Sequence, residues 1–308
     1  MAAFTAKDVQ ALREKTGVGM MKCKEALVAS DGDMEKAIDF LREKGLAASQ
    51  KKASRVAAEG VVLAYVDEDK KVGVVLEVNS ETDFVAKNEK FTDFVSNIAK
   101  TIVRENPADV EALSAMKLEG SDVTVEEMRQ ELVLSIGENM KIRRFERVEG
   151  NAVTYIHGGG TVAVLVLFDT DDATAAKDEF KAMGKDVAMQ IAAMSPSYLD
   201  EESVPAEVLE HEKSILVAQM KEDPKMANKP EAVLGKIVEG KIGKYYKENC
   251  LVEQEFVKNG DFTVGGYIAD VAKKLGADIK PVKFIRYGKG EGLQKKEDNF
   301  AEEVASMM

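Results

Sequence analysis

Residues 60–78 read GVVLAYVDEDKKVGVVLEV, in which two apolar runs flank a polar stretch. Runs rich in Val, Leu and Tyr on either side of a short polar turn are typical of a β-hairpin. Residues 152–169, AVTYIHGGGTVAVLVLFD, repeat this pattern around a triple-glycine turn. The sequence therefore predicts two hairpins of the same kind.

Each hairpin is followed by a helical pattern and then by a further strand. Residues 136–145, IGENMKIRRF, close the first half, and residues 275–284, LGADIKPVKF, close the second. Both begin with Ile or Leu and Gly, continue with a polar pair, and end in alternating apolar residues, which is the pattern of a half-buried strand. We predict an α+β fold with two duplicated subdomains, each a three-stranded antiparallel sheet covered by helices.

Residues 1–54 predict a module of three short helices followed by a basic linker. Thr5 with Asp8 forms a variant capping box for the first helix, and Gly17 is its C-terminal stop. Asp33 is the expected N-cap of the third helix, which we expect to end near Gly45. Residues 49–55, SQKKASR, then form the linker.

The remaining boundaries follow from interruptions of these patterns. The first subdomain covers residues 55–150, and the second covers 151–290 with an insertion at 196–250. Two Glu- and Lys-rich helical segments in the insertion flank a Pro-containing break, which predicts a projecting hairpin of antiparallel helices. Residues 291–308 form a C-terminal module that ends in a short amphipathic helix with Phe300, Val304 and Met307 on one side.

Composition narrows the functional classes. The net charge of −12 argues against a general nucleic-acid binder, because neutralising phosphates needs clustered Lys and Arg. Two cysteines and two histidines leave little room for a metal site. No apolar run approaches the length of a membrane span, and the first 17 residues lack the features of a signal peptide. We expect a cytoplasmic protein without metal or cofactor.

No group of residues predicts covalent catalysis. His157 with its three following glycines is similar to an esterase oxyanion loop, but the G-x-S-x-G nucleophile motif is absent. Residues 288–292, GKGEG, have the wrong spacing for a dinucleotide-binding motif and predict a flexible turn after a strand. The sequence therefore favours a binding protein over an enzyme.

The stretch most informative about function is residues 77–88, EVNSETDFVAKN. Ser80 and Asp83 fit a capping box, and Phe84 continues the helical spacing of Phe91 and Val95, so Phe84 can be interpreted as a core residue. The competing interpretation is an exposed Phe on a strand-to-helix turn, which would form an interface hot spot. The pattern favours the first interpretation but does not decide between them.

Two segments resemble the signatures of the bacterial translation elongation factor Ts family. They are residues 12–27, LREKTGVGMMKCKEAL, and residues 77–86, EVNSETDFVA. The resemblance continues through IGEN at 136–139, YIHG at 155–158, VEGK at 238–241, FIRY at 284–287 and NFAEEVA at 299–305.

This resemblance implies a guanine nucleotide exchange factor for elongation factor Tu that performs no covalent chemistry. It implies that residues 1–54 are ubiquitin-associated-like and that the inserted hairpin is a coiled coil. Asp83 and Phe84, flanked by Thr82 and Val85, would wedge into the GTPase domain of Tu near its magnesium and phosphate sites. The further positions that would contact or support Tu are Lys24, Lys52, Ile136 and His157.

Departures from the family pattern are modest. Ser80-Glu81 replaces the common Cys-Gln beside the wedge, Gly159 and Gly160 are expected to loosen the turn after His157, and Lys258 stands where some members carry Met. We therefore do not assign to Lys258 the contact with Tu that family members make at this position. No membrane or direct nucleic-acid partner is implied, and a homodimer or a 2:2 complex with Tu stays open. The alternative function is an adaptor or holdase without exchange activity.

Overall fold

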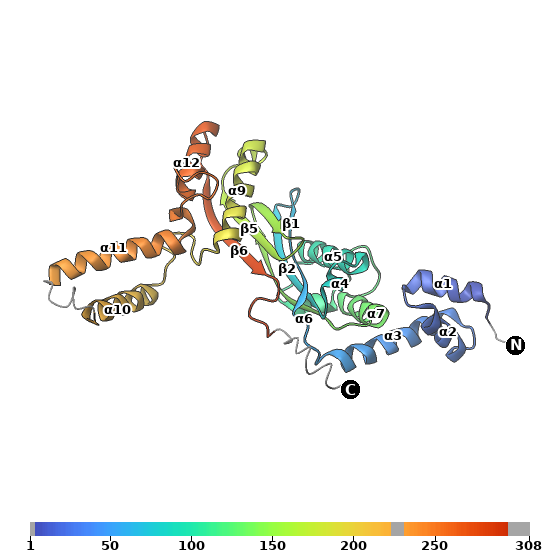
Figure 1. The fold of residues 1–308 in the computed structure, drawn as a ribbon. Helices are drawn as coiled ribbons and strands as arrows, with labels where there is room; N and C mark the ends of the chain where they lie inside the picture. Colours follow the sequence, from blue (N-terminus) through green and yellow to red (C-terminus); the bar gives the residue numbers. More distant parts are fainter. Residues whose placement is uncertain (1–3, 223–230, 295–308) are drawn as a thin grey trace.

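The computed structural model describes residues 4–222 and 231–294. The break predicted at residues 223–230 and the C-terminal helix predicted around Phe300, Val304 and Met307 lie outside the described residues. Figure 1 shows an elongated arrangement, with α1 to α3 at one end, the sheets in the middle, and α10 and α11 at the other end. No helix in the described part of the chain is long and apolar enough to cross a membrane.

The N-terminal helices form a small core that is completed by the first subdomain. They are α1 (Ala6–Thr16), α2 (Met20–Ala29) and α3 (Met34–Lys52). The capping box of Thr5 with Asp8 and the left-handed C-cap at Gly17 are both present, as predicted. Leu12, Leu27 and Leu41 pack together with Leu134 from α7 (Val125–Ile136). Because three short helices bury little surface alone, this contact with α7 enlarges their core.

The prediction that the third helix ends near Gly45 is wrong, because α3 continues to Lys52 and includes most of the expected linker. A Cβ atom at Gly45 would lie 3.3 Å from the backbone oxygen of Gln130 in α7. Gly45 is therefore the place where two helices approach closely, and its missing side chain permits that approach within an intact helix.

The prediction of two three-stranded antiparallel sheets is confirmed. Their strands are β1 (Glu59–Asp67), β2 (Val72–Ser80) and β3 (Met140–Glu149), then β4 (Asn151–His157), β5 (Val162–Asp169) and β6 (Lys280–Gly288). The central strands are β2 and β5. Each closing pair carries a register shift, at Glu77/Val78 in one sheet and Leu167/Phe168 in the other. The two halves thus share strand order and the place of an irregularity.

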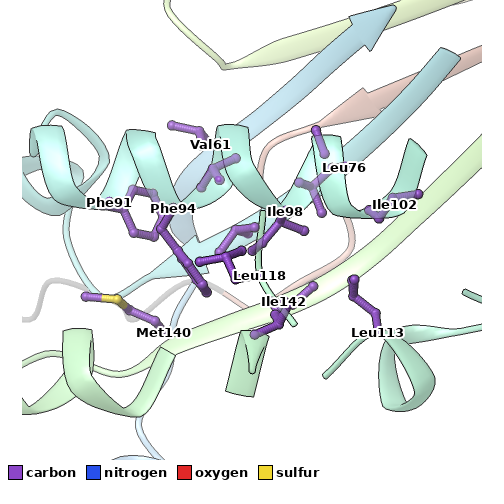
Figure 2. Packing of buried hydrophobic residues seen from close by; sticks show 14 of the residues in the cluster. Val61, Leu76, Phe91, Phe94, Ile98, Ile102, Leu113, Leu118, Met140 and Ile142 are labelled. Carbon is purple, nitrogen blue, oxygen red and sulfur yellow. The ribbon is translucent and has the colours of Figure 1, made fainter. Parts of the chain in front are cut away.

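Helices cover one face of each sheet (Figure 1). The first sheet has α4 (Asp83–Ala86), α5 (Glu89–Glu105), α6 (Val110–Ala115) and α7 (Val125–Ile136). The second has α8 (Asp172–Ala175), α9 (Asp178–Met194), a 3-10 turn (Leu251–Glu253) and α12 (Val264–Leu275). Figure 2 shows Phe91, Ile98 and Ile102 of α5 lying over the first sheet beside Leu76 and Ile142.

The other faces of the two sheets pack against each other. This second core consists of Val62, Ala64, Val75 and Val148 from the first sheet and Ala163, Leu165, Ile285 and Tyr287 from the second. Every residue of β2 is buried, as expected for a strand covered on both faces. A Cβ atom at Gly73 would lie 2.4 Å from Leu165 Cδ1, so glycine permits the close approach of the sheets here.

The predicted helical arm consists of α10 (Ala206–Glu222) and α11 (Glu231–Asn249). The two helices are in contact and lie apart from the sheets in Figure 1. The described part of the arm exposes Val217 and Val233 among charged residues. It is thus a largely solvated projection, as its composition indicated.

Candidate functional site

The turn after β2 presents one aromatic side chain to solvent. Phe84 lies in α4, and 80% of its surface is exposed. Its neighbour Val85 is only 4% exposed and belongs to the core of the first sheet. The interpretation of Phe84 as a core residue is therefore wrong, and the interpretation as an exposed aromatic residue on a turn is correct.

A break in the helix explains why the helical spacing wrongly predicted that Phe84 is buried. α4 has four residues with Lys87 as its C-cap, and Asn88 is then the N-cap of α5, where it accepts a hydrogen bond from the backbone N–H of Lys90. The helical phase is lost between Phe84 and Phe91, so only the residues of α5 continue the buried stripe. Phe91 is fully buried.

The charge beside Phe84 is a carboxylate held in its ionised form. Asp83 accepts a hydrogen bond of 2.8 Å from Lys87 Nζ, and this bond is the largest cause that lowers the pKa of Asp83. Lys289 adds a weaker electrostatic contribution in the same direction. The capping box expected between Ser80 and Asp83 is absent, because Ser80 donates instead to the carbonyl of Thr82, the N-cap of α4. The Asp83 side chain is 51% exposed, so the carboxylate remains accessible to a partner.

The turn is tied to the chain between α7 and β3. Both carboxylate oxygens of Glu138 accept hydrogen bonds from Thr82, one from its backbone N–H and one from its hydroxyl. Glu81 accepts a hydrogen bond from the backbone N–H of Asn139. Sequence reasoning missed Glu81, Glu138 and Asn139 as members of the site. Glu138 and Asn139 were interpreted only as the polar pair before the closing strand, and Glu81 only as a departure from the family pattern.

Lys52 and Ile136 lie at the same junction. Ile136 is the last residue of α7 and is half-buried against the first core. Lys52 donates a hydrogen bond of 2.5 Å to the carbonyl of Gly137, and burial, followed by Arg55 and Lys22, lowers the pKa of the Lys52 ammonium group. Since Gly137 directly precedes Glu138, the last turn of α3 supports the same short segment as the Phe84 turn.

His157 lies at the end of β4, where its Nδ1 is 3.0 Å from the hydroxyl of Tyr155. The three glycines that follow have positive φ angles. The expected loosening of this turn does not extend to Gly160, which is buried and accepts a hydrogen bond of 2.9 Å from the backbone N–H of Val62 in β1. His157 therefore presents an exposed ring from a turn that is fixed to the first sheet.

Lys289 joins the turn after His157 to β1 of the first sheet. The backbone N–H of Lys289 donates to the carbonyl of Thr161, just after the glycines, and its Nζ pairs with Glu59 of β1. Lys289 also contributes to the lowered pKa of Asp83. The predicted residues Thr82 to Val85, Lys52 and Ile136 thus lie at one junction of the first sheet, whereas His157 lies at the end of β4 in the second sheet.

Lys24 is separate from this region. It is exposed on α2, between Met21 and Val28, which are 77% and 59% exposed. Residues three and four apart share a helix face, so the three side chains form one surface. Within the described residues nothing covers these two apolar side chains, and the surface is suited to a protein partner.

The described residues contain no group of three or more His, Cys, Asp or Glu side chains placed to hold a metal ion. Their prominent features are an exposed aromatic side chain on a fixed turn and a second exposed apolar surface on α2. Exposed aromatic residues on rigid supports are typical hot spots of protein interfaces. This combination is typical of a protein whose function is to bind another protein.

Comparisons with known proteins identify the family. A family model described as Elongation factor TS matches residues 81–291. The chain is 49% identical to the elongation factor Ts of Clostridium novyi strain NT over 308 residues, covering 99% of this chain and 98% of that protein. It is 50% identical to that of Clostridium perfringens strain SM101 over 307 residues, with 99% of both chains covered. The chain belongs to the elongation factor Ts family, the factors that exchange guanine nucleotide on elongation factor Tu.

Proposed function

We propose that this protein promotes GDP release from elongation factor Tu by inserting the Phe84 turn beside the magnesium and phosphate site of the GTPase. The observation that carries the proposal is the contrast between two neighbours, since Phe84 is 80% exposed whereas Val85 anchors the turn in the core. A hydrophobic side chain in this position gains its burial only when a partner covers it. After GDP leaves, GTP can bind again.

The magnitudes fit this mechanism. A factor shifts nucleotide binding only by as much as it prefers the nucleotide-free state, and each tenfold change corresponds to about 1.4 kcal/mol. Burial of one Phe side chain supplies roughly 1.5–3 kcal/mol, or about one to two powers of ten. The coupling is reciprocal, so nucleotide weakens the binding of the factor to Tu by the same amount. One wedge residue can therefore supply a useful share of exchange and leave the factor recyclable.

Asp83 adds charge to the same wedge. Its pKa is lowered by Lys87, so the carboxylate is ionised at neutral pH. Magnesium bridges the phosphates of a bound nucleotide to its GTPase. A carboxylate brought beside this ion would compete for it and repel the phosphates. The mechanism is non-covalent, and the protein acts as an exchange factor rather than an enzyme.

The other family positions take supporting roles in this proposal. Lys52 and Ile136 hold the junction behind the wedge, and His157 contacts Tu from the turn between β4 and β5. Lys24 contacts Tu from the surface on α2, with Met21 and Val28 beside it. Two surfaces on one chain would engage the same partner and thereby raise the effective affinity of each.

The division into parts completes the proposal. Residues 1–54 form the ubiquitin-associated-like module, 55–150 and 151–290 the two core subdomains, 196–250 the coiled-coil insertion, and 291–308 the C-terminal module. The protein works in the cytoplasm with Tu as its partner, without nucleic acid or membrane. It forms a homodimer or a 2:2 complex with Tu.

Release of fluorescent GDP from purified elongation factor Tu tests this function. Substoichiometric amounts of the protein are expected to accelerate release, with each molecule acting on many Tu molecules. An adaptor or holdase would bind Tu, as seen in a pull-down, without changing the release rate. Binding without acceleration would therefore contradict the exchange function.

A further inference from the structure

The geometry points to Glu138 as a positioning residue that holds the Phe84 turn in its binding orientation. This inference rests on the proposed function, since it assigns to Glu138 an effect on exchange that passes through Phe84. Glu138 lies between Gly137, the C-cap of α7, and the first residues of β3. Its own side chain points to the turn after β2, 56 residues earlier in the chain.

Glu138 uses both oxygens on one residue of that turn. Its Oε2 accepts a hydrogen bond of 3.0 Å from the backbone N–H of Thr82, and its Oε1 accepts one of 2.7 Å from the Thr82 hydroxyl. Hydrogen bonds to a carboxylate are stronger than those between neutral groups. Two such bonds to backbone and side chain fix both the position and the rotation of Thr82.

A reciprocal bond locks the same two segments together. Glu81, which precedes Thr82, accepts a hydrogen bond of 2.6 Å from the backbone N–H of Asn139, which follows Glu138. Ser80 donates to the carbonyl of Thr82 at 2.9 Å. We call Glu81, Thr82, Glu138 and Asn139 the turn clamp. Phe84 is two residues from the clamp and makes none of its bonds.

The turn needs such a support because α4 is too short to define its own orientation. A helix of four residues cannot offset the cost of helix nucleation. The Thr82 side chain does not cap α4, since its hydroxyl bonds to Glu138 instead. The direction of Phe84 is therefore set from outside α4, by the clamp on one side and by the buried Val85 on the other.

The residues on either side of Glu138, Gly137 and Asn139, are themselves held in place by hydrogen bonds. Gly137 ends α7 with a φ angle of 96°, and its carbonyl accepts the hydrogen bond from Lys52. Asn139 is 5% exposed and donates through Nδ2 to the carbonyl of Arg55 at 2.9 Å. The residues on either side of Glu138 are thus held by α3 and by the segment that follows it. Because its neighbours are held, the Glu138 carboxylate has a defined position, and its two hydrogen bonds hold Thr82 in place.

Three variants separate positioning from general structural loss. Glu138→Ala removes both bonds to Thr82. Glu138→Gln can retain them, because its amide oxygen accepts the N–H and its amide nitrogen donates to the hydroxyl, which can act as an acceptor. The matched control is Glu127→Ala, since the Glu127 carboxylate also accepts a hydrogen bond from a threonine N–H, that of Thr124 at the other end of α7, at 2.7 Å.

The measurement is GDP release from elongation factor Tu at increasing concentrations of each variant, with thermal unfolding as the check on folding. We expect Glu138→Ala to lower the saturating release rate about tenfold, which corresponds to about 1.4 kcal/mol. Glu138→Gln is expected to recover most of that rate. Glu127→Ala is expected to lose stability without slowing exchange at equal folded protein. Equal exchange rates for Glu138→Ala and the wild type would overturn the inference.

A double-mutant cycle with Phe84→Ala tests whether Glu138 acts through Phe84. If it does, Glu138→Ala slows exchange in the wild-type background and has almost no further effect in Phe84→Ala. Equal losses in both backgrounds would show an independent role and overturn the inference. If Phe84→Ala exchanges slowly but Glu138→Ala does not, only this inference fails. If Phe84→Ala exchanges at the wild-type rate, the wedge itself fails, and the positioning role fails with it.

Discussion

The carboxylate of Glu77 in β2 accepts a hydrogen bond of 2.8 Å from the backbone N–H of Gly290, 213 residues later in the chain. Glu77 is fully buried, and it also accepts hydrogen bonds from Asn79, Arg143 and Arg144. The loop after β6 is thereby fastened to the sheet that ends in the Phe84 turn. Residues 288–292 were predicted to form a flexible turn, and they form a docked loop instead.

The hydrogen bonds to the Glu77 carboxylate predict that the protein loses stability at acidic pH. Burial by itself raises the pKa of Glu77, but the hydrogen bonds from Asn79, Gly290, Arg144 and Arg143 together outweigh burial, so the pKa lies below the ordinary value of 4.5. A carboxyl group with a lowered folded pKa contributes stability that is fully present above its unfolded pKa and is lost as the pH falls through the folded pKa. We expect Glu77→Gln to reduce stability at pH 7 by about 3 kcal/mol and to weaken the loss of stability below about pH 4.5.

Urea unfolding at several pH values measures both effects. Glu68→Gln is the control, because Glu68 pairs with Lys181 at the surface and is 74% exposed. Its stability should stay within about 0.5 kcal/mol of the wild type. If Glu77→Gln and the wild type lose stability in parallel as the pH falls, Glu77 is not the responsible carboxylate.

A pair of glycines tests how closely the loop after β6 approaches the first sheet. Gly290 has a φ angle of +66°, and a Cβ atom there would lie 2.4 Å from the carbonyl oxygen of Ala58. Gly276 has a φ angle of +64° but an open surrounding. We expect Gly276→Ala to cost about 1 kcal/mol from backbone strain alone, and Gly290→Ala to cost about 3 kcal/mol because the loop must also move. Chemical denaturation gives both values, and equal losses would show that the loop is not docked in solution.

Substitutions of the adjacent residues Phe84 and Val85 are expected to affect stability differently. Val85→Ala should lower the free energy of unfolding by about 2 kcal/mol, because a buried side chain loses contacts in the core of the first sheet. Phe84→Ala should change stability by no more than about 0.5 kcal/mol, since Phe84 lies in solvent. Urea unfolding measures both. A comparable loss for Phe84→Ala would mean that its ring is packed against the protein.

Local sequence patterns were sufficient to predict the strands and several helix caps. The alternating and continuous apolar runs define β1 to β6 because the period of a strand is visible within a few residues. The left-handed C-cap at Gly17 follows in the same way from a single residue. These features depend on neighbours in the sequence, which is why the pattern contains them.

Features that depend on distant contacts were not predictable. Gly45 was interpreted as a helix end, although its role is set by the backbone of Gln130. The packing of the two sheets was missed, even though the apolar run of β2 is typical of a strand buried on both faces. Glu138 acts on Thr82, 56 residues away, and no local pattern distinguishes it from other acidic residues. The exposure of Phe84 follows from the break after α4, which spacing alone did not reveal.

If the exposed Phe84 ring drives exchange, GDP release from elongation factor Tu must be slower with Phe84→Ala than with the wild-type protein. Val233→Ala serves as the control, since Val233 is an exposed apolar residue on the arm. We predict that Phe84→Ala lowers the saturating release rate by about tenfold or more at unchanged stability, whereas Val233→Ala releases GDP at the wild-type rate. Release by Phe84→Ala at the wild-type rate, with equal amounts of folded protein, would contradict the account.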